Sequence, residues 1–276
     1  GALPFAFDAD WFNTGATPAI NDFFMPGSSE EDWSVGFRLI NGGATRVFSN
    51  FDRQGIRDVA AGTADLSVAG NAVAETSGIV DGRIDYEQKV EIRADDTFFT
   101  TTVTLSNLKN GTLFDVRYLH NMDPDQEVVA HNELSTVNDV LSNPSGEIGE
   151  AIVSAKGVNS GISMVFVADN SSGDGIEARA SAAGGLFHRY PYEASRFTSS
   201  NDPTTNDAIT FVFKAASIAA RANVSFSYIS TVNTATDGND FLVGTAGADS
   251  LTGDLGNDEL RGLAGTDSLS NIENVI

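Results

Sequence analysis

Hydrophobic and polar residues alternate along short stretches of residues 1–233, and Gly, Asn, Asp or Ser closes each stretch. A period of two is that of a β-strand with one buried face. β-branched and aromatic side chains, which favour strands, are frequent there. The pattern predicts strands over residues 33–39, 83–92, 98–105, 113–119, 162–167, 209–213 and 224–229.

Two other stretches of this region have a weaker pattern. Residues 58–74 are rich in Ala and Gly, which is typical of strand edges or a hairpin, and residues 128–141 are compatible with one helix. Many short strands separated by turns indicate an all-β fold with an antiparallel β-sandwich. We therefore predict a sandwich over residues 1–233 whose core holds most of the 18 Phe, with a linker over residues 230–236.

After residue 234 the period changes to nine. Asp recurs at positions 240, 249, 258 and 267, Gly at 238, 247, 256 and 265, and Leu at 242, 251, 260 and 269. Glycine permits tight turns, Leu can fill the inside of a coil, and Asp supplies oxygen ligands for a hard cation. A disordered Gly- and Asp-rich linker is the alternative interpretation.

The repeat resembles the G-G-x-G-x-D-x-U-x nonapeptide of RTX proteins, which forms a calcium-binding parallel β-roll. The resemblance implies that two repeats make one coil, so that Asp240 stacks on Asp258 and Asp249 on Asp267. It also implies a short roll over residues 234–276 in which the second glycine of each unit is replaced, by Thr236, Thr245, Asp254 and Leu263. The Ca²⁺ ligands expected in the roll are Asp237, Asn239, Asp240, Gly247, Asp249, Asn257, Asp258, Gly265 and Asp267.

Charge and cysteine content narrow the classes of partner. The chain has 16 Lys and Arg against 38 Asp and Glu, a net charge of −22. Nucleic acid and anionic membranes need a basic surface, so neither is an expected partner. Without cysteine there is no disulfide and no thiolate metal site. No apolar run approaches the roughly 20 residues of a membrane span.

A second calcium site is expected in the loop after residue 118. Asn121, Asp123, Asp125 and Glu127 occupy every second position there, next to Pro124. Such oxygens can converge on one Ca²⁺, and closely spaced carboxylates repel without a cation. A solvated acidic turn is the alternative. The polar clusters at 169–175 and 201–207, and Asp95 with Asp96, are attributed to turns, with a cation-binding loop as the alternative at 169–175.

The loop 184–192 is a candidate recognition surface, because Tyr and Arg give large contact areas with polar tips. Its alternative is a loop whose aromatic residues fold back on the core. The residues expected to contact a ligand are Asp123, Asp125, Gln126, His188, Arg189, Tyr190 and Tyr192.

No catalytic motif supports an enzyme. The three His lack zinc-protease spacing, and neither a G-x-S-x-G elbow nor a nucleotide-binding loop is present. The abundant carboxylates leave a glycosidase open without supporting one. We expect a binding protein.

A β-rich acidic module followed by a short roll resembles the ligand-binding region of large bacterial RTX adhesins. The resemblance implies a monomeric, calcium-dependent module of a longer chain, exported by type I secretion to the cell surface and acting in adhesion and biofilm formation. It implies binding to peptide or protein C-termini. A calcium-dependent carbohydrate-binding module and a structural extender domain are the alternatives.

Overall fold

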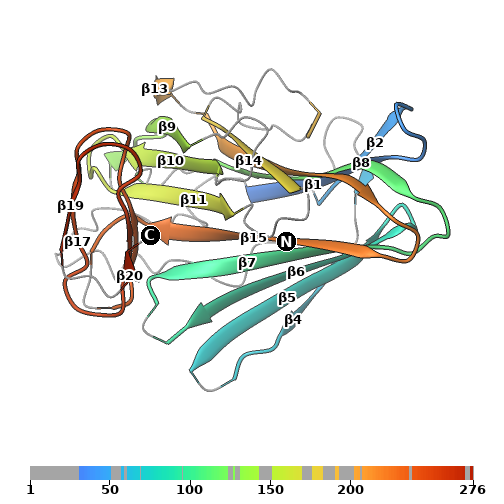
Figure 1. The fold of residues 1–276 in the computed structure, drawn as a ribbon, viewed down its shortest axis with the longest axis horizontal. Coiled ribbons are helices and arrows are strands. Elements are labelled where there is room, and N and C mark those ends of the chain that lie inside the picture. Colours follow the sequence, from blue (N-terminus) through green and yellow to red (C-terminus); the bar gives the residue numbers. More distant parts are fainter. Residues whose placement is uncertain are drawn as a thin grey trace.

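A computed structural model describes residues 31–50, 57–58, 61–68, 70–94, 96–123, 127, 131–142, 151–169, 176–182, 190–192, 202–205, 207–235, 238–270 and 274–275. These residues form two stacked sheets and a coil of short strands that lies against one end of them (Figure 1). No helix in this part of the chain is long and apolar enough to cross a membrane. The all-β sandwich and the terminal β-roll expected from the sequence are confirmed.

The first sheet of the sandwich has the strand order β12-β14-β8-β1-β2-β3. Its strands are β1 (Glu31–Arg38), β2 (Thr45–Ser49), β3 (Arg57–Asp58), β8 (Leu113–Met122), β12 (Ile176–Ser181) and β14 (Ile209–Ile218). Neighbouring strands are antiparallel except β2 and β3.

The second sheet is antiparallel throughout, in the order β13-β9-β10-β11-β15-β7-β6-β5-β4. Its strands are β4 (Ala61–Asp65), β5 (Asn71–Val80), β6 (Ile84–Arg93), β7 (Phe98–Asn107), β9 (Thr136–Ser142), β10 (Ala151–Gly157), β11 (Ser163–Asp169), β13 (Asp202–Thr205) and β15 (Asn223–Val232). Strands β4 and β5 form the hairpin expected over residues 58–74.

Two expectations about secondary structure are wrong. Residues 136–142, within the segment compatible with a helix, form β9, where β-branched Thr136 and Val140 favour a strand and pairing with β10 fixes it. The expected linker begins too early, because β15 continues to Val232 and pairs there with Met164.

The core between the sheets is aromatic. Trp33 of the first sheet stacks on Tyr86 of the second, with ring centroids 4.0 Å apart, and Phe213 stacks on Phe226 at 4.5 Å. All four side chains are buried. Stacked pairs of this kind add to the free energy gained from buried area, and these two pairs join the sheets.

A chain of polar groups runs through this aromatic core. The Tyr86 hydroxyl donates to Gln88, whose amide donates to the Tyr228 hydroxyl, which lies 3.5 Å from Nδ1 of His120. The His120 ring is 1% exposed and lies against Phe166 and Phe211. Burial lowers the pKa of His120 to about 3, so this imidazole is neutral in the folded protein at neutral pH.

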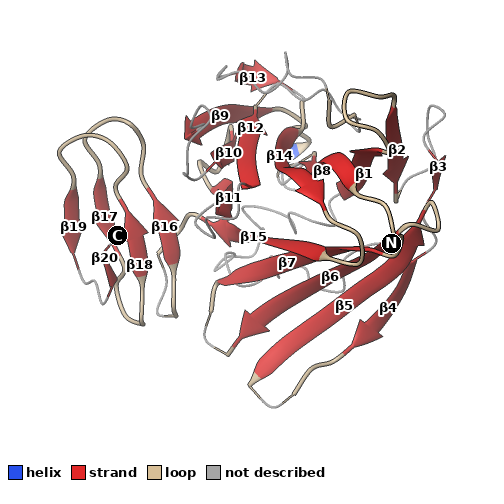
Figure 2. Ribbon diagram, turned by 45° about the vertical axis from the view of Figure 1, so that its right-hand side comes forward, coloured by secondary structure: helices blue, strands red, loops and turns tan. Residues whose placement is uncertain are grey.

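The roll consists of β16 (Phe241–Val243), β17 (Ser250–Thr252), β18 (Glu259–Arg261), β19 (Ser268–Ser270) and β20 (Asn274–Val275). Strands β16, β18 and β20 form one parallel sheet and β17 and β19 the other. Figure 2 shows these strands stacked beside β11 and β15. Leu242 and Leu260 are buried inside the coil, and Leu251 and Leu269 are half-buried.

Candidate functional site

The roll stacks equivalent residues eighteen positions apart. Phe241 pairs with Glu259 and Ser250 with Ser268. The backbone N–H of Asp240 donates to Oδ1 of Asp258 at 2.9 Å, and that of Asp249 to Oδ1 of Asp267 at 3.1 Å. The two Asp pairs expected from the repeat are therefore neighbours in adjacent coils.

Two glycines of the roll lie where no side chain fits. Gly256 has a φ of +127° and Gly265 a φ of +131°, in the region that favours glycine. A Cβ atom at Gly256 would collide with the carbonyl oxygen of Gly238, and one at Gly265 with that of Gly247. Glycine at the same position of successive coils therefore permits the coils to stack closely.

Two of the four residues that replace the second glycine keep the backbone conformation of glycine. Asp254 and Leu263 have φ values of 63° and 64°. The left-handed conformation costs a non-glycine residue about 1–2 kcal/mol, and Asp tolerates it better than Leu because its short polar side chain can bond locally. These two positions explain how a degenerate repeat still folds into the coil.

Oxygen atoms of two kinds converge at the turns of the roll. Beside Gly244 lie Oδ2 of Asp249 and the carbonyl oxygen of Gly262, each within 3 Å of where a Cβ atom would stand. Asp240 and Asp258 are fully buried neighbours. Two buried carboxylates repel each other unless a cation or a proton lies near them. The donor set of carboxylate and carbonyl oxygens fits Ca²⁺.

The described residues contain no cluster of three or more His, Asp or Glu side chains arranged around a metal position. Each carboxylate of the roll would therefore bind Ca²⁺ together with backbone carbonyl oxygens. The expected ligands Asn239, Gly247, Asn257 and Gly265 all lie in these turns, and Asn239 Oδ1 accepts a hydrogen bond from the Asn257 N–H. Asp237 lies outside the described residues.

Polar contacts fix the first repeat to the sandwich. The Thr97 N–H donates to the Asn239 carbonyl at 3.0 Å, and its hydroxyl donates to Oδ1 of Asp240 at 2.6 Å. The Asn239 amide donates to Asp96 at 3.0 Å. On the other side of β16, the Asn233 amide bonds both the N–H and the carbonyl of Val243. A residue of the calcium-binding repeat thus contacts the sandwich directly.

Apolar contacts complete this junction. Phe241 and Val243 pack with Ile152, Val165 and Val167 on the outer face of the second sheet. Phe241 also meets Phe98 edge-on at 5.8 Å and lies 4.6 Å from the Arg261 guanidinium. This docking could not be predicted from the sequence, because Asp95 and Asp96 resemble an ordinary turn and the junction joins residues about 140 positions apart.

Of the second predicted calcium site, the structure describes Asn121, Asp123 and Glu127, and Asp125 and Gln126 lie outside the described residues. Asn121 is fully buried in β8, and its Oδ1 accepts the Thr210 hydroxyl at 2.6 Å. It lies in a row of buried polar residues that crosses the sheet, directly between Asp32 and Thr210. Asp123 follows β8 and is 6% exposed.

The Glu127 carboxylate accepts hydrogen bonds from the turn between β10 and β11. It accepts the N–H groups of Asn159 and Ser160 and the Asn159 amide, and it fits against Gly157. Burial raises the pKa of Glu127, but the bonds from Ser160 and Asn159 together hold it below its ordinary value. Glu127 therefore secures the β10–β11 turn.

Replacing Glu127 by Gln is expected to destabilise the fold by about 1–2 kcal/mol, because the charge-assisted bonds to the turn are lost. The loss should be the same in calcium and in EGTA, measured by urea unfolding. Glu133→Gln, with one local bond to the Ser135 N–H, is the control and should change stability little. A loss seen only in calcium would make Glu127 an ion ligand after all.

The predicted recognition loop is described at residues 190–192, and His188 and Arg189 lie outside the described residues. The Tyr192 ring lies 4.5 Å from the Arg117 guanidinium and 5.5 Å from that of Arg38, and its hydroxyl donates to the Asp115 carbonyl. Burial raises the Tyr192 pKa. This residue anchors the loop.

Tyr190 is the more accessible of the two, 38% exposed, with its hydroxyl 2.8 Å from that of Thr45. Arg117, against which Tyr192 lies, is six residues before Asp123 along β8. That separation corresponds to roughly 20 Å of strand. Tyr192, beside Arg117, and Asp123 are therefore too far apart for direct contact.

Comparison with known proteins identifies the C-terminal region. Residues 234–269 match the RTX calcium-binding nonapeptide repeat, in four copies. The match shows that this region consists of calcium-binding repeats of the RTX kind, as the sequence pattern predicts. No curated protein matches the chain in sequence.

Solved structures resemble this chain only distantly. The heparan sulfate lyase HepC mutant from Pedobacter heparinus is 11% identical over 64% of this chain and 22% of the lyase, with a TM-score of 0.38. A galactose mutarotase related enzyme from Lactobacillus acidophilus is 9% identical, and the match covers 66% of this chain and 73% of the enzyme's chain, with a TM-score of 0.26. The chain spans about a fifth of the lyase, and these likenesses carry no argument about function.

Proposed function

We propose that this chain is a calcium-dependent ligand-binding module of a secreted RTX adhesin, acting by binding and not by catalysis. The observation that carries the proposal is the contact between Asp240 and Thr97. It connects the calcium-binding repeat to the sandwich, so that an ion bound in the roll stabilises the surface beside it. A free-standing roll would have no such effect on a ligand-binding domain.

The ligand of the proposed module is a peptide or protein C-terminus on a host or neighbouring cell. Asp123 directly follows β8 and carries a carboxylate at the start of the acidic loop 123–127. A Ca²⁺ held there with an open coordination position would accept a terminal carboxylate. Tyr190, which is exposed and whose hydroxyl lies beside that of Thr45 on β2 of the same sheet, would supply side-chain contacts.

Replacing Asp123 by Ala is expected to abolish calcium-dependent binding of peptides with a free C-terminal carboxylate, because the ion loses a charged ligand. Calorimetric titration with a peptide library, with and without EGTA, measures this. Amidated peptides should not bind, and Asp139→Ala, a substitution on β9, is the control that should bind normally.

Two outcomes contradict the peptide proposal. Unchanged binding by the Asp123 variant would remove this residue from the site. No peptide binding at all would favour the carbohydrate-binding alternative if a glycan array shows ligands, and a structural extender domain if it does not.

A further inference from the structure

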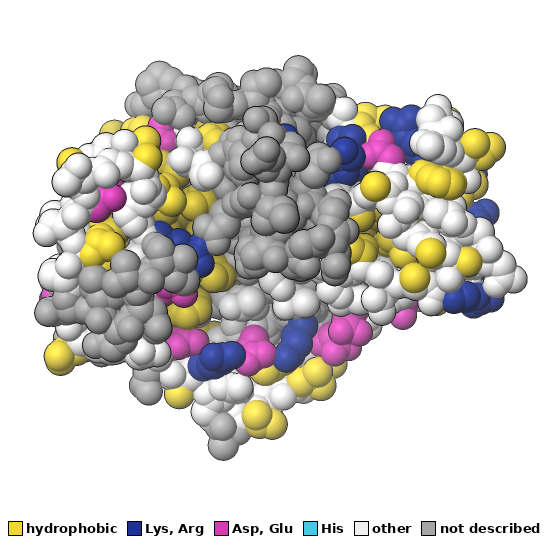
Figure 3. Space-filling view, in the orientation of Figure 1, with side chains coloured by type: hydrophobic (Ala, Val, Ile, Leu, Met, Phe, Trp, Pro, Cys, Tyr) yellow, Lys and Arg dark blue, Asp and Glu magenta, His cyan; other side chains and the backbone are white. Residues whose placement is uncertain are grey.

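The outer face of the second sheet carries a groove beside the roll. The described residues that line it are Lys89, Glu91, Arg93, Asp96, Phe98, Thr100 and Thr102. Its volume is about 290 Å³, near the lower end of the roughly 300–1,000 Å³ found for ligand pockets. In Figure 3, acidic and basic side chains alternate in a line across the β5–β7 part of this face.

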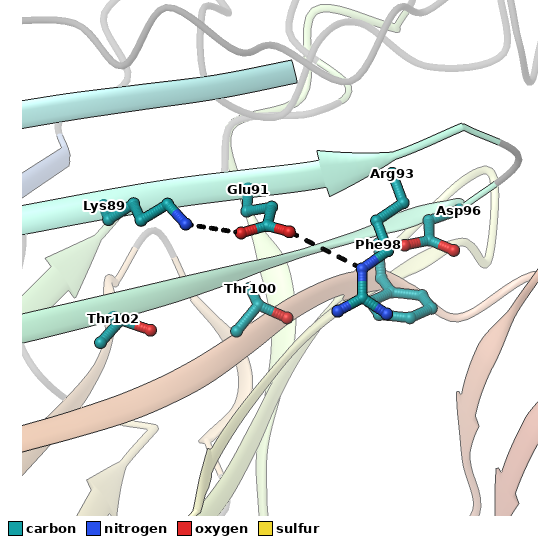
Figure 4. A pocket seen from close by; sticks show the side chains of 7 residues that line it. All are labelled: Lys89, Glu91, Arg93, Asp96, Phe98, Thr100 and Thr102. Atoms are coloured by element: carbon teal, nitrogen blue, oxygen red, sulfur yellow. Dashed lines mark hydrogen bonds and ion pairs between the residues drawn. The ribbon is translucent and has the colours of Figure 1, made fainter. Parts of the chain in front are cut away.

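Strand geometry explains the arrangement of the groove. Lys89, Glu91 and Arg93 alternate along β6 and point away from the core, while Val90 points into it. Across the ladder, Lys89 faces Thr102 and Glu91 faces Thr100 on β7. Figure 4 shows these side chains on one side of the sheet, with the Phe98 ring at the end near Arg93.

The charges of the groove balance. Lys89 bonds Glu91 at 2.8 Å, and the Arg93 Nε lies 3.7 Å from the other oxygen of Glu91. With Asp96, the groove has two cations and two carboxylates, in a chain whose net charge is −22. The groove has no excess of positive charge to attract an anionic ligand against the net negative charge of the protein, and a groove whose apolar contribution is one Phe ring does not favour an apolar ligand.

Hydroxyl groups complete the floor of the groove. The Thr102 hydroxyl lies 3.1 Å from that of Ser227 on β15. Thr100 pairs with Ile229 of β15, whose side chain has no polar group that could bond the Thr100 hydroxyl. The groove thus presents carboxylate acceptors, cationic donors, hydroxyls and an aromatic ring within a few residues.

A peptide cannot bind here by adding a strand. Both floor strands are already paired on each side, β6 with β5 and β7, and β7 with β6 and β15. Binding must therefore use side chains, and strand addition needs an exposed sheet edge. We infer that this groove binds a neutral oligosaccharide, whose hydroxyls both donate and accept and whose ring carries an apolar face.

The roll closes one end of this site. Asp96 accepts the Asn239 amide, and Phe98 contacts Phe241. Binding of a saccharide should therefore weaken when calcium is removed. The site lies on the opposite sheet from Asp123, so it goes beyond the proposed peptide site and is tested separately from it.

The test is binding of the full chain, in millimolar calcium, to an array of neutral and acidic oligosaccharides, followed by calorimetry with the strongest neutral glycan. Thr100→Tyr fills the groove and is expected to weaken binding about tenfold or more through steric clash. Thr104→Tyr is the matched control, because Thr104 lies on the same strand and face but outside the groove. It should bind within about twofold of the parent.

Each result decides the inference. The inference is supported if Thr100→Tyr alone loses glycan binding while both variants melt at the temperature of the parent protein. Equal binding by both variants overturns it, as does binding of acidic glycans alone or of no glycan. Saccharide binding that survives Thr100→Tyr but is lost in Asp123→Ala overturns the groove while leaving a ligand-binding module in place.

Discussion

Removal of calcium is expected to lower the melting temperature of the whole chain, and not merely to unfold the roll. Each ion bound at a hundredfold excess over its dissociation constant contributes about 2.7 kcal/mol to the free energy of unfolding. For a domain of this size, each kcal/mol corresponds to roughly 2–4 °C. Because β16 packs on β10, β11 and β15 through Phe241 and Val243, this stabilisation reaches the sandwich.

Scanning calorimetry in calcium and in EGTA measures the effect, and a pair of variants tests its origin. Asp258→Asn replaces a buried carboxylate of the roll and should remove most of the calcium-dependent stabilisation. Asp254→Asn is the control. Asp254 is exposed and is not one of the Asp residues that recur every nine positions, and Asn tolerates the left-handed backbone conformation found at this position. If the sandwich melts at the same temperature in calcium and in EGTA, the roll is an independent unit and this account is contradicted.

Acid is expected to destabilise the sandwich through His120. The folded-state pKa is lowered by burial to about 3, while the unfolded-state value is the ordinary 6.5. Between these values the unfolded chain binds a proton that the folded chain excludes. The free energy of unfolding therefore decreases as pH falls below about 6.5, by about 1.4 kcal/mol per pH unit, until the folded form also binds the proton near pH 3.

Substitution isolates this contribution from that of the many carboxylates. His120→Phe keeps the aromatic packing against Phe166 and Phe211 and should flatten the dependence of stability on pH between 6.5 and about 4. His131→Phe, at an exposed position, should leave the dependence of the parent unchanged. Urea unfolding across this range measures both, and parallel curves for the parent and the His120 variant would contradict a neutral buried imidazole.

Features that depend on a local period were predictable from the sequence. Alternation along residues 84–93 and 98–107 predicts both the strand and its outward face, and the resemblance of the nine-residue repeat to RTX nonapeptides implies which Asp residues stack. The helix expected around residue 136 fails because local composition was ambiguous there and pairing of β9 with β10 decides the conformation.

The functional junctions depend on tertiary contacts and left no local signal. Asp96 and Thr97 meet Asn239 and Asp240 across more than 140 residues. The sequence places Glu127 in a row of candidate metal ligands, and it does not predict the bonds that its carboxylate accepts from Asn159 and Ser160, in a turn 32 residues away. The groove required knowing that β6 and β7 are neighbours and that the roll docks at their end.

Hydrogen exchange at the Thr97 amide tests the central claim most directly, because this N–H donates to the Asn239 carbonyl of the first repeat. We predict strong protection in millimolar calcium and its loss in EGTA, together with that of the Val243 amide, while the amide of Tyr228, on β15 in the middle of the second sheet, remains protected. Equal protection of Thr97 in both conditions would contradict a roll whose calcium orders the surface of the sandwich.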